Sequence, residues 1–219
     1  MRQGIMIMKS NLSTFMTAGL LWFASSVWGA TVPLNPGKTL TFDCASNYSL
    51  TKKESKKLDT QTATASVVLS LDTAGTLLTI DLVNNSPVAS ETTLYGLDLG
   101  LPNKFLSVNP MDATFNSFPA SAQWHGPTDL GNPTNAIGAC TFAARDMIFG
   151  NPADFLDKQK TLTASFLPSG QGGRIVVKLA GTMDAKTRPL LIDPIAYFLT
   201  NDPNNQNKRI QIASTGVQK

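Results

Sequence analysis

The sequence has very little of the chemistry that enzymes and metal sites use. It contains a single histidine, His125, and two glutamates, Glu54 and Glu91. One histidine excludes a multi-histidine zinc site within one chain, and any histidine-dependent triad would have to include His125. The Gly-x-Ser-x-Gly sequence of the α/β-hydrolases is also missing. We therefore predict a protein that is not an enzyme and that holds no cofactor or metal.

Charge is scarce as well. Charged residues make up 15% of the chain, and the formal net charge is +3. Removing Arg2 and Lys9 with the leader described below leaves 16 of the 18 basic residues against 15 acidic ones. The one dense charged run, KKESKK at 52–57, has no interleaved arginine or aromatic residue. This pattern predicts no nucleic-acid partner. We interpret the run as a solvated loop, with contact to acidic polysaccharide or lipid as the alternative.

No apolar run is long enough for a comfortable membrane span. The longest, Phe15 to Val27, follows Lys9 and is followed by small residues, which is the pattern of a secretory signal peptide. Small residues at the cleavage positions favour cleavage after Gly29, so residues 1–29 are the expected signal peptide. Translation could start at Met1 or at Met8. We expect a secreted or periplasmic protein with no transmembrane anchor.

The remaining 190 residues, 30–219, are enough for one domain with a full hydrophobic core. Two cysteines, Cys44 and Cys140, lie in this part. An even number of cysteines in an exported chain favours a disulfide between them. Two separately buried thiols are the alternative.

The stretch from Ala65 to Leu101 contains three strand patterns separated by turn residues. In its first two strands, Val67, Leu69 and Leu71, then Leu78, Ile80 and Leu82, alternate with mostly polar residues, which predicts strands with one buried face. A hairpin loop at 72–75, with Gly75 as a bulge, joins these strands. In the third strand we expect Tyr95, Leu97, Leu99 and Leu101 to face inward and Gly96, Asp98 and Gly100 to face outward.

Weaker strand patterns lie on both sides of this stretch. Leu40, Phe42 and Cys44 share one face of an expected first strand, and a second hairpin is expected over 162–179. Pro194 interrupts the apolar run 190–199, which predicts an edge strand. A short helix is expected after Asn151, and a short last strand, 209–213, precedes a polar tail. Together these patterns predict an all-β protein, a single antiparallel β-sandwich of about seven to nine strands, jelly-roll or immunoglobulin-like.

The segment 104–150 loses the alternation and is rich in proline, glycine and asparagine, so we expect long loops there. Binding residues often lie on such loops. The candidates in this segment form a possible ligand-binding loop: Phe115, Phe118, Trp124 and His125. The alternative is that the aromatic rings close one end of the sandwich.

Three features resemble a class of exported bacterial β-sandwich proteins, the PEP-CTERM-associated type. They are the strand pair TLLTIDLVNN (76–85) and LYGLDLGLP (94–102), the Gly138-Ala139-Cys140 loop, and the strand 160–166 reached through an Asn-Pro turn. The C-terminal Pro-Glu-Pro sorting segment of that class does not occur here. The resemblance implies a cell-envelope or extracellular role and no particular chemistry.

These observations predict a secreted, non-enzymatic protein with a structural or interaction role at the cell envelope. Its partner is unknown, with extracellular polysaccharide and another envelope protein as the two possibilities. The alternative function is a glycan-binding module that uses the loop aromatics around Trp124.

Overall fold

The computed structural model describes residues 32–51, 58–100, 112–119, 122, 124–128, 136–137, 140–141, 147–150, 167–179, 190–202 and 205–219. In these residues the protein is all-β, and every strand pairing is antiparallel. The one helical element among them is a 3-10 turn, η1 (Val88–Ser90). The expected signal peptide, the lysine-rich run 52–57 and the expected helix after Asn151 lie outside the described residues.

The first strands in the chain are β1 (Val32–Leu34), β2 (Thr39–Thr51), β3 (Leu58–Leu71), β4 (Leu77–Asn84) and β5 (Thr93–Gly100). Short strands follow, namely β6 (Asp112–Asn116), β7 (His125–Thr128), β8 (Ala136–Ile137), β9 (Cys140–Thr141) and β10 (Met147–Gly150). The last three are β11 (Gly172–Lys178), β12 (Leu190–Asp202) and β13 (Asn205–Gln218).

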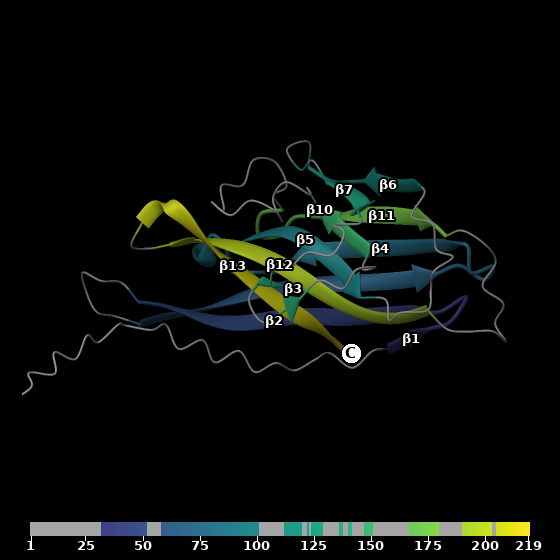
Figure 1. Cartoon of the computed structure of the whole chain (residues 1–219), viewed down its shortest axis with the longest axis horizontal. Coiled ribbons are helices and arrows are strands. Elements are labelled where there is room, and N and C mark those ends of the chain that lie inside the picture. Colours follow the sequence, from purple (N-terminus) through teal and green to yellow (C-terminus); the bar gives the residue numbers. More distant parts are fainter. Residues whose placement is uncertain are drawn as a thin grey trace, which may run out of the picture.

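Eleven of these strands form one sheet in the order β6-β11-β4-β3-β2-β13-β12-β5-β10-β7, with β1 added beside β12. The sheet bends round on itself, and its two end strands, β6 and β7, come into contact. Figure 1 shows the long strands β2, β3, β12 and β13 running across the molecule. The prediction of antiparallel all-β structure is confirmed. The predicted seven to nine strands are too few, and one nearly closed sheet replaces a clear two-sheet sandwich.

Strand β13 connects the two halves of the sheet. Most of its length pairs with β12, and its last residues, Gly216 to Gln218, pair with β2 instead. The change of partner occurs at Gly216, where a Cβ atom would lie 2.7 Å from Cγ of Pro194. Only glycine fits this close approach. The predicted polar tail is therefore the part of β13 that joins the two halves.

The hydrophobic core lies between the two halves. It contains the inward-facing side chains of the central hairpin and of the strands opposite, among them Phe42, Val67, Leu69, Leu78, Ile80, Leu82, Leu97, Leu99, Phe149, Ile175, Val177, Ile192 and Phe198. The prediction that Val67, Leu69 and Leu71 face inward together with Leu78, Ile80 and Leu82 is confirmed. The inward positions of Ile175 and Val177 in the second hairpin are confirmed too, whereas residues 162–166 lie outside the described residues.

The turn of the central hairpin is fastened by one carboxylate. Oδ1 of Asp72 accepts hydrogen bonds from the backbone N–H groups of Thr76 at 2.6 Å and Leu77 at 2.9 Å. Gly75 has φ +68°, the left-handed conformation that the predicted bulge requires. Desolvation acts to raise the pKa of Asp72, but the hydrogen bonds from Leu77 and Thr76 outweigh it and hold the pKa below its usual value.

Two predictions about strand position are wrong. Strand β12 is not an edge strand, because it pairs with β5 on one side and with β1 and β13 on the other. Its Pro194 falls between Ile192, the last residue paired with β1, and Ile195, the first paired with β13. No neighbouring strand needs a backbone N–H at that point, so the proline is tolerated in a central strand.

The second wrong prediction concerns the two faces of β5. The register between β5 and β12 shifts between Gly96 and Leu94, which leaves Tyr95 as an extra residue. Tyr95 therefore lies on the opposite side from Leu97, in a second apolar cluster with Ile148, Tyr197 and Leu199. Asp98, which was expected to face outward, is fully buried. Both faces of β5 are thus covered.

Candidate functional site

A regular surface is formed by the side of β2, β3, β4, β11 and β6 that faces away from the core, which we call the outer face. Because side chains alternate between the two faces of a strand, every second residue of these strands lies on the outer face. Each of these residues whose exposure is described is partly or fully exposed. Its members include Thr39, Thr41, Asp43, Ser66, Val68, Ser70, Leu77, Thr79, Asp81, Val83, Thr114, Asn116, Arg174, Val176 and Lys178.

Strand register arranges these side chains in rows. One row runs from Thr41 through Val68 and Asp81 to Arg174, and the next runs from Ser70 through Thr79 to Val176. Neighbouring strands lie about 4.8 Å apart, and residues on the same face of a strand are about 7 Å apart. The outer face is therefore a grid of short side chains with a regular spacing.

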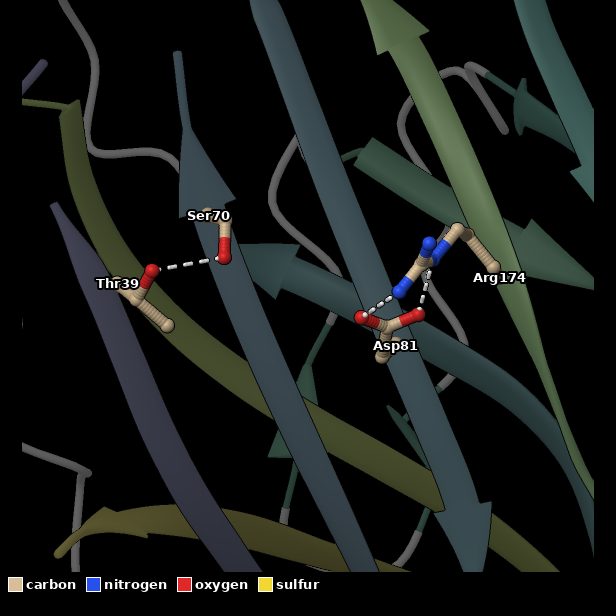
Figure 2. Close-up of polar contacts among 4 residues, drawn as sticks. All are labelled: Thr39, Ser70, Asp81 and Arg174. Atoms are coloured by element: carbon tan, nitrogen blue, oxygen red, sulfur yellow. Dashed lines mark hydrogen bonds and ion pairs between the residues drawn. The ribbon is translucent and has the colours of Figure 1, made fainter. Parts of the chain in front are cut away.

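Many of the polar groups in the grid are paired across strands. The hydroxyl groups of Thr39 and Ser70 are 2.9 Å apart (Figure 2), and Oγ1 of Thr62 donates to Oδ1 of Asn47 at 2.8 Å. Such pairs hold the side chains in fixed rotamers, and β-branched threonine and valine are already restricted. The paired and the β-branched side chains of the face are therefore restricted in their rotamers.

Two ion pairs lie within the same surface. Arg174 contacts both carboxylate oxygens of Asp81, at 2.6 Å and 2.9 Å (Figure 2), and Nζ of Lys219 lies 2.7 Å from Oδ2 of Asp43. The hydrogen bond to Asp81 raises the pKa of Arg174 above its ordinary value. Because each charge has an opposite neighbour, these pairs give the outer face no strong field of either sign.

The predicted ligand-binding loop residues are brought together, but their rings pack on one another. The ring centroids of Phe115 and Phe118 are 5.7 Å apart, and those of Phe118 and Trp124 are 5.4 Å apart. Trp124 is only 4% exposed and belongs to the hydrophobic core. Stacking of a sugar requires an open ring face, which Trp124 does not offer. His125 is exposed at the start of β7.

The ring of Phe118 also covers a glycine of β11. A Cβ atom on Gly173 would lie 2.4 Å from two carbon atoms of that ring. The ring thus fills the space that a side chain at position 173 would occupy. This contact supports the interpretation in which the aromatic residues close one end of the fold.

The predicted disulfide between Cys44 and Cys140 is not present in this structure. Cys44 is a free, fully buried thiol beside the point where β13 joins β2. Burial raises the pKa of Cys44 to about 12, although a hydrogen bond with the Ala196 backbone acts in the opposite direction. At neutral pH the thiol is protonated and unreactive. For Cys140 the structure describes the backbone in β9 and not the side chain.

Other kinds of site find no support in the part of the chain that the structure describes. Within it, no three acidic, histidine or cysteine side chains lie together where they could hold a metal ion. Among the same residues, no helical segment has the length and hydropathy that spanning a membrane would require.

Comparisons with known proteins found no match for this chain among protein families, curated proteins or solved structures.

The outer face could have been recognised in the sequence from its alternation. In β3 the outward-facing series Thr60, Thr62, Thr64, Ser66 alternates with alanine and glutamine, which are weaker strand signals than valine or leucine. The apolar residues that alternate in the central hairpin indicate only the core side of the same strands. The signal for the candidate surface was the identity of the alternate residues, most of which are short hydroxyl or β-branched side chains.

Proposed function

We propose that this protein acts outside the cytoplasm, secreted or periplasmic, as a non-enzymatic interaction or structural protein of the cell envelope. The observation that carries the proposal is the outer face, a wide and regular surface of short polar and β-branched side chains. Its partner is an extracellular polysaccharide or another envelope protein.

The composition of the outer face suits a broad, flat partner. Hydroxyl groups such as those of Thr79 and Thr114 can both donate and accept hydrogen bonds, which matches the hydroxyl groups of a polysaccharide. Exposed apolar residues lie between them, with Leu77 at 42% and Val83 at 38% exposure. Because most of these side chains are short or β-branched, binding would cost little side-chain entropy.

Two features of the sequence support the location. The signal-peptide pattern of residues 1–29 predicts export, and the resemblance to exported β-sandwich proteins of the PEP-CTERM-associated type implies an envelope role. Because Arg174 and Lys219 are paired with Asp81 and Asp43, the outer face fits an uncharged partner better than nucleic acid.

The proposal can be tested with one matched pair of substitutions. Val176→Lys places a long charged side chain in the middle of the outer face, and Val88→Lys makes the same change at a site on η1 that is 80% exposed. We expect the purified protein to co-sediment with envelope polysaccharide or protein fractions, and Val176→Lys to weaken this binding by about tenfold.

Val88→Lys should bind like the unmodified protein, because its position lies outside the outer face. Equal binding by the two variants would contradict the role of the outer face. Catalytic turnover of a substrate by the purified protein would contradict the non-enzymatic proposal.

A further inference from the structure

The end of β13 joins the two halves of the sheet without placing a side chain in the core. This segment, residues 216–219, which we call the strap, lies along β2 (Figure 1). The N–H of Lys219 donates to the carbonyl of Thr41 at 3.0 Å. Gly216 is buried but has no side chain, and the other three residues are exposed, with Val217 at 66%. Backbone pairing therefore provides most of the attachment of the strap.

The preceding part of β13 is attached more firmly. It pairs with β12 as far as Thr215, and its Ile212 and Ser214 are buried, at 3% and 5% exposure. A backbone hydrogen bond contributes little net stability, because water replaces it on opening, whereas burial of apolar side chains contributes more. The strap can therefore leave β2 while the rest of β13 stays on β12.

An ion pair adds little to the attachment of the strap. Nζ of Lys219 lies 2.7 Å from Oδ2 of Asp43, and the two side chains are 60% and 42% exposed. Water and salt screen such a pair, so it contributes little to stability. When the strap leaves β2, Asp43 loses this basic neighbour.

The strap covers two buried residues of β2. A Cβ atom on Gly216 would lie 3.1 Å from Cβ of Phe42 and 3.3 Å from Sγ of Cys44. It would also lie 2.7 Å from Cγ of Pro194 on β12. Phe42 and Cys44 are almost completely buried, at 1% and 0% exposure. Departure of the strap would thus uncover the thiol of Cys44 at the junction of the two halves.

We propose that the strap is a conformational device that opens and closes over Cys44 while the rest of the fold stays intact. The hinge lies between Thr215 and Gly216, where β13 changes partner from β12 to β2. In the closed state the strap pairs the two halves of the sheet. In the open state Cys44 is accessible, and Asp43 is separated from Lys219. This inference goes beyond the proposed function and does not depend on it.

Alkylation of Cys44 in the folded protein tests the proposal, because iodoacetamide reaches this thiol only when the strap is open. Peptide mapping separates Cys44 from Cys140. At low urea we expect slow alkylation with a rate that hardly depends on urea, because local opening exposes little surface. In Gly216→Ala the added Cβ has no room in the closed state, so the alkylation rate of Cys44 should rise by about tenfold or more.

Two further variants separate strap opening from a general loss of structure. Val217→Ala is the matched control, because its side chain is exposed, and it should leave the alkylation rate of Cys44 unchanged. Deletion of residues 217–219 removes most of the strap without introducing a clash. This variant should keep a cooperative urea transition and be alkylated about tenfold faster than the unmodified protein.

Three results would overturn the proposal. One is an alkylation rate in the unmodified protein that follows the urea dependence of global unfolding down to zero urea. Another is an equal alkylation rate of Cys44 in the unmodified protein and in the variant lacking residues 217–219. The third is loss of the cooperative urea transition in that deletion variant, because the strap would then be inseparable from the rest of the fold.

Discussion

The two halves of the sheet bury their side chains differently. In β3 and β4, on the half that carries the outer face, buried and exposed residues alternate along each strand. In β5 and β12, on the other half, Leu94 to Leu99 and Ala196 to Thr200 are buried without interruption. One half therefore offers a wet surface, whereas the other is covered on both faces. This difference is why the candidate surface lies on the first half.

The largest expected effect tests burial on both faces of β12. Tyr197 and Phe198 are neighbours on opposite faces, and both are fully buried. Replacing either one with alanine should lower the free energy of unfolding by about 3 to 5 kcal/mol, because each change leaves a large cavity. Urea denaturation measures both values. A cost below about 1 kcal/mol for Tyr197→Ala would mean that its face is not covered.

In the half that carries the outer face, substitutions at two neighbouring residues of one strand should have very different effects on the free energy of unfolding. Ile80 is fully buried, whereas the next residue, Asp81, lies on the outer face in an exposed ion pair with Arg174. Ile80→Ala should cost about 2 to 5 kcal/mol in denaturant unfolding, and Asp81→Ala should cost under about 1 kcal/mol. Equal costs would show that the register of β4 is wrong.

A smaller effect is expected at the turn that joins β3 and β4. Asp72→Ala removes the acceptor for the N–H groups of Thr76 and Leu77, which should cost about 1 kcal/mol at pH 7. The folded state lowers the pKa of Asp72, so its carboxylate stabilises the fold above the unfolded-state pKa. This contribution should disappear as the pH falls through the folded-state pKa.

Melting curves of the unmodified protein and Asp72→Ala between pH 7 and pH 2 measure how the contribution of Asp72 to stability changes with pH. Asp72→Asn is the control, because its side-chain oxygen still accepts hydrogen bonds but does not titrate in this range. A gap between the unmodified protein and Asp72→Asn that widens on acidification would contradict the assigned sign.

The smallest expected effect is that of a reducing agent. Cys44 is a free thiol buried between the two halves, so reduction should shift the melting temperature by less than about 1 °C. Its thiol should resist alkylation in the native protein and react after unfolding, because burial raises its pKa to about 12. A Cys44–Cys140 linked peptide and a fall of several degrees on reduction would restore the disulfide prediction.

The sequence was informative where one face of a strand is exposed to solvent. Val67, Leu69 and Leu71 alternate with polar or exposed positions, and this pattern was sufficient to predict the central hairpin and its turn at Asp72. The pattern failed in β5, because Tyr95 and Leu97 lie on opposite faces on account of a register shift. Because both faces of β5 are buried, the alternating Gly96 and Asp98 do not mark a face exposed to solvent.

Other features depend on contacts between residues far apart in the chain. A proline within a strand, such as Pro194, by itself predicts an edge strand. The sequence does not show that the partner strand on one side of β12 changes from β1 to β13 at this residue. The separation of β13 from β2 after Cys44 likewise has no local signal in the sequence. The burial of Trp124 could not be distinguished from exposure, because both fit a loop rich in proline and glycine.

The central claim is that the outer face is the functional surface of the protein. Hydroxyl-radical footprinting with mass spectrometry tests it directly, with and without saturating envelope polysaccharide or protein. We expect Leu77, Val83 and Val176 to be oxidised in the free protein and protected when the partner is bound, and Tyr95 and Tyr197 to stay unmodified in both states. Protection elsewhere with unchanged oxidation of these three residues, or rapid oxidation of Tyr95 and Tyr197 in the free protein, would contradict the account.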